Sequence, residues 1–189
     1  MTSNLMLIRG ERILEQMTEQ LNEESSYKDL EQKTLQFLPA TKKRQFAVNP
    51  IQITKMKLVP FRESQTLEAH ATATSDGKKY QPSISFSDVI YEDSDQNDNV
   101  SFIGSDKEEY HIMPISLGRN TVKVRCTCLD FRWRFSIWNN NDGSLLGDPP
   151  GPYQKKTDRP PVNTKRTPGV CKHLMKEVIA LKEAGLLTQ

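Results

Sequence analysis

The sequence predicts an α+β fold with N-terminal helices, a central antiparallel sheet and a C-terminal module that ends in a helix. Two observations lead to this fold class. Between residues 50 and 126, apolar and polar residues alternate in short runs separated by turn residues, which is typical of antiparallel strands. Before and after this region, apolar residues recur every three or four positions, which indicates helices with one buried face.

The segment 1–45 is expected to be helical. A first helix is predicted by apolar residues at spacings of three and four, namely Leu14, Met17 and Leu21. A second helix is expected from Tyr27 to Leu38, and Pro39 closes it. The residues on one face of this second helix are Tyr27, Leu30 and Phe37.

The segment 46–118 is expected to form the antiparallel sheet. A run of apolar residues begins at Ile51, and Pro60 stops it. A second run, Leu67–Ala73, alternates with polar residues and ends at a turn formed by residues 75–77. Further short strands are expected at Ile84–Tyr91, Val100–Ile103 and Tyr110–Ile115, and beyond this segment at Val122–Cys126.

The segment 119–189 is expected to be a C-terminal module. Residues 143–169 hold six of the 11 prolines and four of the nine glycines without periodic hydrophobicity, which predicts a loop. A helix follows, with Thr167 as its cap and Pro168 in its first turn, and Gly185 ends it. Its buried stripe is expected to comprise Leu174, Val178, Leu181 and Ile179.

The composition excludes several classes of protein. The 189 residues carry 26 Lys and Arg against 24 Asp and Glu, so the net charge of +2 is too small for a chain that is basic throughout. No apolar run approaches the roughly 18 residues of a membrane span, and no signal peptide is recognisable. Three cysteines, an odd number, disfavour a disulfide-rich secreted domain and indicate thiols in a reducing compartment.

All three cysteines belong to two short motifs that have the character of a metal site. Cys126 and Cys128 end a predicted strand, and a bend at Thr127 would let both sulfurs converge on one ion. Cys171 and His173 open the last helix, whose N-terminus favours a thiolate. Structural zinc takes four such ligands in a tetrahedron, so the sequence predicts one Zn²⁺ bound by these four residues.

Three alternatives to this ligand set stay open at this point. The cysteines could be buried free thiols, or two of them could form a disulfide, although a Cys126–Cys128 disulfide would be strained. His111 could replace His173 as the fourth ligand. A catalytic zinc is disfavoured, because three thiolates and a histidine leave no open position for water. Asp130 lies near the site, two residues after Cys128, and could accept a hydrogen bond from His173, but a solvated aspartate explains it as well.

The spacing of these residues resembles the SWIM-type zinc finger. In that family a strand ends in Cys-x-Cys, a hairpin follows, and Cys-x-His enters a helix; Cys126, Cys128, Cys171 and His173 match this motif. The spacer Leu129–Val170 is 42 residues long, which is longer than usual and implies an added loop. The wider run from Cys126 to Leu174 is similar to tailed-phage proteins that carry such a finger, which implies a virion component.

The aromatic residues after the Cys-x-Cys motif alternate with arginines. The residues of this run are Phe131, Arg132, Trp133, Arg134 and Phe135. A period of two predicts a strand with the aromatics on one face. The aromatics either pack on the C-terminal helix with the arginines in solvent, or form a surface for nucleic acid or a partner protein.

Charge is segregated along the chain despite the small net charge. Asp88–Glu109 contains eight acidic residues and one lysine, whereas Arg119–Lys176 contains twelve basic and four acidic residues. These segments are either solvated surface or complementary patches that dock against other copies or other proteins. The loop 143–169 is expected to be a contact arm, with Tyr153 as an anchor and three nearby basic residues, Lys155, Lys156 and Arg159.

The expected function is that of a non-enzymatic, zinc-stabilised structural or assembly protein that makes protein–protein contacts, as a tailed-phage virion component. Expected partners are other virion or assembly proteins and other copies of the chain, with no membrane and no small-molecule substrate. The expected location is the virion and the host cytoplasm. The alternative is a nucleic-acid-binding accessory protein that uses the basic finger. A continuous basic groove beside Trp133 would favour that alternative, and dispersal of the basic residues into separate contacts would favour assembly.

Overall fold

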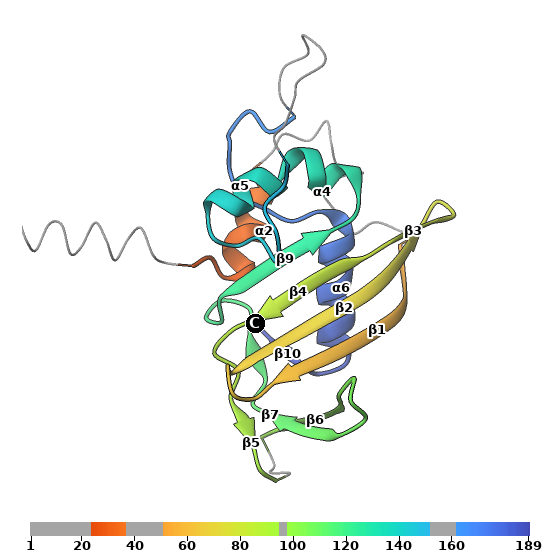
Figure 1. Cartoon of the computed structure of the whole chain (residues 1–189), viewed down its shortest axis with the longest axis vertical. Coiled ribbons are helices and arrows are strands. Elements are labelled where there is room, and N and C mark those ends of the chain that lie inside the picture. The colour runs from red at the N-terminus through yellow and green to blue at the C-terminus, as the bar shows by residue number, and fades with distance from the viewer. Residues whose placement is uncertain (1–23, 37–50, 95–97, 152–161) are drawn as a thin grey trace, which may run out of the picture.

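The computed structural model describes residues 24–36, 51–94, 98–151 and 162–189, and it has the α+β architecture that the sequence predicts (Figure 1). The described helices are α2 (Tyr27–Leu35), α4 (Leu129–Arg134), α5 (Ser136–Asn141) and α6 (Lys172–Glu183). The strands are β1 (Gln52–Phe61), β2 (Thr66–Ser75), β3 (Lys78–Tyr80), β4 (Pro82–Phe86), β5 (Tyr91–Glu92), β6 (Val100–Ile103), β7 (Glu109–Ile112), β8 (Ile115–Ser116), β9 (Val122–Cys126) and β10 (Leu187–Thr188).

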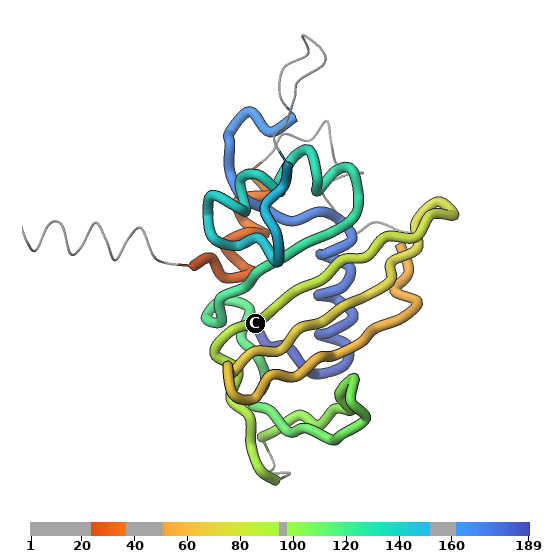
Figure 2. Tube along the Cα trace, viewed as in Figure 1, coloured from red at the N-terminus to blue at the C-terminus, as the bar shows by residue number. Residues whose placement is uncertain are grey.

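An antiparallel sheet in the order β1-β2-β4-β9 forms the centre of the molecule, and β3 pairs with the end of β2. α6 lies behind one face of this sheet and contacts β1, β2, β4 and β9 (Figures 1 and 2). The opposite face, which is turned toward the viewer, is crossed by no described helix or strand. β9 thus links the predicted sheet to the C-terminal module; the boundaries at residues 45 and 118 stay predictions.

Alternation along β2 explains why α6 packs on one face of the sheet. The residues of β2 that face the helix are buried and small, apart from the first, and they are Leu67, Ala69, Ala71 and Ala73. From α6 the buried stripe contributes Leu174, Val178 and Leu181, as predicted, whereas Ile179 is 36% exposed and does not belong to it. Each large apolar side chain buried in this way stabilises the fold by about 1.5–3 kcal/mol.

α2 is anchored beside β9 by its first turn. Ser26 caps the helix and forms a capping box with Asp29, and the backbone N–H of Val122 donates to the carbonyl of Ser25 (3.0 Å). Tyr27 and Leu30 are buried, as the helical pattern predicts. The helix ends at Leu35 with Gln36 as its C-cap, so the predicted end at Leu38 is wrong, and the first predicted helix lies outside the described residues.

A smaller sheet in the order β5-β7-β6 carries most of the acidic segment. It is attached to β1 through the backbone N–H of Ser105, which donates to the carbonyl of Leu58 (2.7 Å). A surface ion pair between Arg62 and Asp93 (2.7 Å) joins the two sheets as well. The described chain ends in β10, which pairs in parallel with β8, so not every strand pairing is antiparallel.

The aromatic run is helical, so the strand predicted there is wrong. α4 and the turn after it place Phe131 and Phe135, four residues apart, in the core, and leave Trp133 47% exposed. The side chain of Cys128 caps this helix by accepting a hydrogen bond from the backbone N–H of Phe131 (3.3 Å). A five-residue run with apolar residues at positions i, i+2 and i+4 is compatible with a strand and with a helix. Here the Cys128 cap and the buried pair Phe131 and Phe135, at i and i+4, favour the helix.

Two predicted boundaries are also wrong. The last helix begins at Lys172 with Cys171 as its N-cap, not at Thr167 and Pro168, because side chains of α2 and α5 hold the preceding residues in an extended path. β1 continues through Pro60, which is tolerated because β1 is an edge strand. In the predicted loop, residues 143–151 and 162–169 contain no helix or strand beyond the single bridge of Leu145 to Val124, whereas the proposed anchor at Tyr153 lies outside the described residues.

Glu177 is a buried carboxyl group in the middle of α6. Its side chain is 0% exposed, and neither carboxyl oxygen has a hydrogen-bond partner in the part of the chain that the structure describes. This burial raises the pKa of Glu177 well above the ordinary value of a glutamate. Folding therefore favours the neutral form of this group.

Glu177→Gln is expected to make the protein more stable at neutral pH and to leave its stability at acidic pH nearly unchanged. Above the ordinary glutamate pKa the unfolded wild-type chain loses this proton while the folded chain keeps it. The free energy of unfolding therefore falls by about 1.4 kcal/mol per pH unit until the raised pKa is reached. Glutamine carries no titratable proton, so the free energy of unfolding of Glu177→Gln lacks this pH dependence. Urea unfolding at several pH values in this range measures the free energy of unfolding, with the exposed Glu183→Gln as control. If that free energy changes with pH equally in wild type and Glu177→Gln, the prediction is wrong.

Candidate metal centre

The end of β9 and the start of α4 present two sulfur atoms on one side of the chain. Cys126 is the last residue of β9, and Cys128 is the N-cap of α4, so the chain bends at Thr127. Two hydrogen bonds hold this bend: Thr127 N donates to Gln81 O (3.3 Å), and Gln81 N donates to Thr127 Oγ1 (2.9 Å). The bend that the sequence predicts is thus fixed by the residue that precedes β4.

The start of α6 supplies the third sulfur and an imidazole. Cys171 has extended backbone geometry (φ −90°, ψ 166°) as the N-cap, and its side chain makes no capping hydrogen bond. His173 is the second residue of the helix. Its ring stacks on Tyr80, with the ring centroids 4.2 Å apart, which orients the imidazole.

These four side chains converge on one point. One donor atom from each of Cys126, Cys128, Cys171 and His173 lies within 4.8 Å of every other, and all four residues are buried. Cys126 Sγ is 3.9 Å from His173 Nδ1. All three cysteines are free thiols, so the disulfide alternative is wrong for this structure.

The other two histidines have different partners. His111 Nδ1 is hydrogen-bonded to the Ser101 hydroxyl (2.8 Å) in the small sheet, which removes it as an alternative fourth donor. His70 contacts Glu68 (2.9 Å) and Ser83 (3.0 Å) in the main sheet. Among the described residues, the group that could hold a metal ion is therefore the one that the two motifs predict.

The hydrogen bonds among the thiols suit a site for a cation. Hydrogen bonds from the thiols of Cys126 and Cys171 lower the pKa of Cys128, which favours its thiolate. The same hydrogen bond to Cys128 raises the pKa of Cys126, and burial raises the pKa of Cys171. A buried thiolate is costly without a cation, and a bound ion would displace the two remaining thiol protons. Four protein donors close the coordination shell, which suits a structural ion more than a catalytic one.

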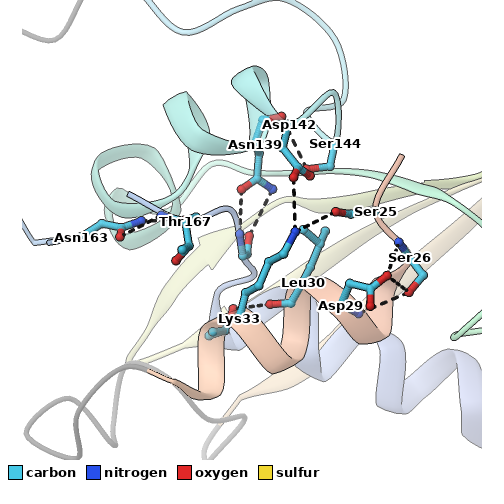
Figure 3. A network of polar contacts seen from close by, with 12 residues as sticks. Ser25, Ser26, Asp29, Leu30, Lys33, Asn139, Asp142, Ser144, Asn163 and Thr167 are labelled. Carbon is cyan, nitrogen blue, oxygen red and sulfur yellow. Dashed lines mark hydrogen bonds and ion pairs between the residues drawn. The ribbon is translucent and has the colours of Figure 1, made fainter. Parts of the chain in front are cut away.

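The chain that leads to Cys171 is clamped by buried side chains. We call residues 163–170 the strap. From α5, Asn139 Nδ2 donates to Gly169 O (3.1 Å), and Gly169 N donates to Asn139 Oδ1 (2.9 Å) (Figure 3). From α2, Thr34 Oγ1 accepts a hydrogen bond from Val170 N (2.8 Å). Both helices therefore set the position of the backbone that comes directly before Cys171.

The far end of the strap is held by its own asparagine. Asn163 Nδ2 donates to Thr167 O (2.7 Å) and to Arg134 O (2.8 Å), and Thr167 N donates to Asn163 Oδ1 (3.3 Å) (Figure 3). At the near end, a Cβ added to Gly169 would come within 2.7 Å of the Phe135 ring and 2.5 Å of Thr34 Oγ1. A residue without a side chain is therefore required where the strap passes between α2 and α4.

The sequence motifs predict the four residues of the Cys/His cluster but not the residues that position them. Thr34, Asn139 and Asn163 each bind at least one backbone group that is far away along the chain, and they carry no motif. Their signal in the sequence is weak. It consists of a polar residue at a position where the helical pattern expects a buried apolar one, such as Thr34 one turn after Leu30. Asp130 forms an ion pair with Arg134 (3.3 Å), four residues away on α4.

No protein-family model, curated protein or solved structure matches the chain. None of the described helices has both the length and the apolar character that a membrane span requires.

Proposed function

We propose that Cys126, Cys128, Cys171 and His173 bind one Zn²⁺ and that residues 122–186 form a zinc finger of the SWIM type. Three thiolates and one imidazole are the donors that structural zinc prefers. The order of elements supports the proposal, since a strand ends in Cys-x-Cys and Cys-x-His opens a helix. The departure from that family is the insert, where α4 and α5 take the place of a hairpin.

We further propose that the chain is a non-enzymatic assembly protein that contacts other proteins as a component of a tailed-phage virion. One observation carries the protein-contact proposal. Three apolar side chains at spacings of four along α4 and α5 are exposed, by 65% for Leu129, 47% for Trp133 and 40% for Ile137. We call them the apolar strip. Cys128 caps α4, so a bound ion would hold the strip in a fixed position, which lowers the entropic cost of docking.

The basic residues around the finger support a protein partner over nucleic acid. Arg132 lies over the Trp133 ring (4.8 Å to the centroid), and Arg134 is buried. Arg125 donates to the carbonyls of Leu146 and Asp148. These described arginines make separate contacts within the chain and form no continuous basic groove beside Trp133. The proposed location is accordingly the virion and, before assembly, the host cytoplasm.

A salt titration separates the two classes of partner. Binding to duplex and single-stranded DNA is expected to be weak at physiological salt, because Arg125, Arg132 and Arg134 make separate contacts within the chain instead of lining a groove that could hold six or more phosphates. Fluorescence anisotropy with labelled DNA at several salt concentrations measures it. Nanomolar affinity at physiological salt would replace the assembly proposal with the nucleic-acid alternative.

Particle incorporation tests the virion proposal directly. In particles purified from the source, the wild-type chain is expected at a constant ratio to the major particle proteins. The double variant Leu129→Ser/Trp133→Ser is expected to keep its fold and metal but to fall at least about tenfold in particles, because two apolar anchors are lost. Ile179→Ser, an exposed apolar residue on α6, is the matched control. Absence of the wild-type chain from particles would contradict the proposal.

A further inference from the structure

The face of the main sheet opposite α6 carries polar residues and several lysines, with Val59 and Phe61 of β1 at one end. The residues of β2 that point away from the helix are polar, and they are Thr66, Glu68, His70, Thr72 and Thr74. Lys57 lies across from His70, Lys55 lies across from Thr72, and Lys79 lies across from Thr74. Residues paired across neighbouring strands share a face. We call this surface the basic face.

The positive charge of the basic face is largely unneutralised. Lys55, Lys57 and Lys79 are exposed, and none of them has an ion-pair partner in the described part of the chain. The acidic residue on the face, Glu68, contacts His70 (2.9 Å). An oppositely charged surface could therefore dock here with little displacement of existing contacts.

The β1 edge of the main sheet is protected against pairing with a strand of another molecule. A partner is therefore expected to contact the basic face and not this edge. β1 is the edge strand, and its pairing with β2 is irregular between Ile53 and Lys55. Pro60 near its end lacks a backbone donor. Bulges, lysines and prolines are common devices against edge-to-edge pairing.

The small sheet β5-β7-β6 carries the opposite charge. Exposed carboxylates gather at the β6–β7 turn, at Asp106, Glu108 and Glu109, with Lys107 as the basic residue of the turn. Ile103 at the end of β6 is 62% exposed beside them. We call this surface the acidic turn. Charged groups around an exposed apolar residue are typical of a small docking surface.

The acidic turn cannot neutralise the basic face of its own chain. Its Ser105 is hydrogen-bonded to Leu58 on the outer edge of β1, so the turn lies beside the sheet and not across its face. A phosphate backbone lying on the face would meet these carboxylates at the edge, which disfavours a polyanion. A second copy of the chain offers the acidic turn itself.

We propose that the chain self-associates head to tail, with the acidic turn of one copy on the basic face of the next. The two surfaces differ, so a pair of copies keeps one free basic face and one free acidic turn, and the contact extends to a ring or a filament. The inference goes beyond the proposed function, because it uses neither the metal site nor the apolar strip.

Sedimentation velocity as a function of protein concentration tests the proposal. Association is expected at about 50 mM NaCl and is expected to weaken at least tenfold at about 500 mM NaCl, where exposed charges are screened. Lys55→Glu/Lys57→Glu and Glu108→Lys/Glu109→Lys are each expected to remain monomeric, because each meets like charge. An equimolar mixture of the two variants is expected to associate again, because the face made acidic in one variant attracts the turn made basic in the other.

Two further variants serve as controls for the association experiment. Lys182→Glu, on α6 away from both surfaces, is expected to associate like wild type, and so is Leu129→Ser/Trp133→Ser, which tests only the proposed function. A wild-type monomer at low salt, or a mixture of the two reversed variants that stays monomeric, would overturn the proposal. Binding of a single-stranded oligonucleotide that is lost in Lys55→Glu/Lys57→Glu would replace it with a nucleic-acid surface.

Discussion

Cys128→Ser is expected to abolish stoichiometric zinc binding and to unfold the module that contains α4, α5 and the start of α6. Cys128 has two roles in the structure, as a donor in the four-residue cluster and as the cap of α4. Structural zinc in finger peptides stabilises folding by on the order of 10 kcal/mol at neutral pH, which is comparable to the stability of a whole domain. Elemental analysis of the purified protein and hydrogen exchange of residues 127–174 measure the two effects.

A conservative change at the neighbouring residue is the control for Cys128→Ser. Thr127→Ser keeps the hydroxyl that accepts the hydrogen bond from Gln81, so its metal content and exchange protection are expected to equal those of wild type. Removal of the metal from wild type with a chelator should reproduce the Cys128→Ser exchange pattern. If wild type purified without chelators contains no metal, or if Cys128→Ser keeps wild-type protection, the zinc proposal is wrong.

Asn139→Ala is expected to lower the free energy of unfolding by about 2–4 kcal/mol, because it leaves two buried backbone groups without partners. Asn139 is 0% exposed, and both ends of its amide bond to Gly169. Since Gly169 precedes Cys171 by two residues, loss of the clamp should also speed zinc release. Denaturant unfolding and the rate of metal transfer to a coloured chelator measure the two effects.

The next residue along the chain provides the matched comparison for Asn139→Ala. Asn140 is an exposed asparagine in the same helix, and Asn140→Ala is expected to change stability by less than about 0.5 kcal/mol. Equal stability of the two variants would show that the strap does not depend on Asn139. Unchanged metal release in a destabilised Asn139→Ala would limit its role to the fold.

The strands and the Cys/His cluster could be predicted because their signals are local. Leu67–Ala73 alternates over a long run, and Val100–Ile103 matches β6 to the residue. The Cys-x-Cys and Cys-x-His motifs each place two donors by local geometry alone. α4 could not be predicted, because the spacing of Phe131, Trp133 and Phe135 is compatible with a strand and with a helix. Tertiary packing decides between the two.

The contacts that are distant in sequence carry no signal of this kind. β10 pairs with β8, more than 70 residues earlier, through two short segments that resemble ordinary turns in sequence. Asn139 and Gly169 are 30 residues apart, and their mutual bonds arise only when α5 and the strap pack together. The burial of Arg134 likewise depends on the packing of α4, since its sequence position beside Arg132 suggested solvent.

The spacing of the donor pairs has a consequence for how the chain can vary in length. An ion held by both pairs would join Cys128 to Cys171 and close a ring of chain around the 42 residues between them. The entropy of closing a flexible loop grows only with the logarithm of its length, at about 0.6 kcal/mol for each doubling. Gly151 lies within this ring, and in the described part of the chain no atom other than those of its chain neighbours lies within 4 Å of a Cβ built there. Extra residues inserted at Gly151 would thus be nearly free of thermodynamic cost, and a backbone cut there would leave two fragments joined by the metal.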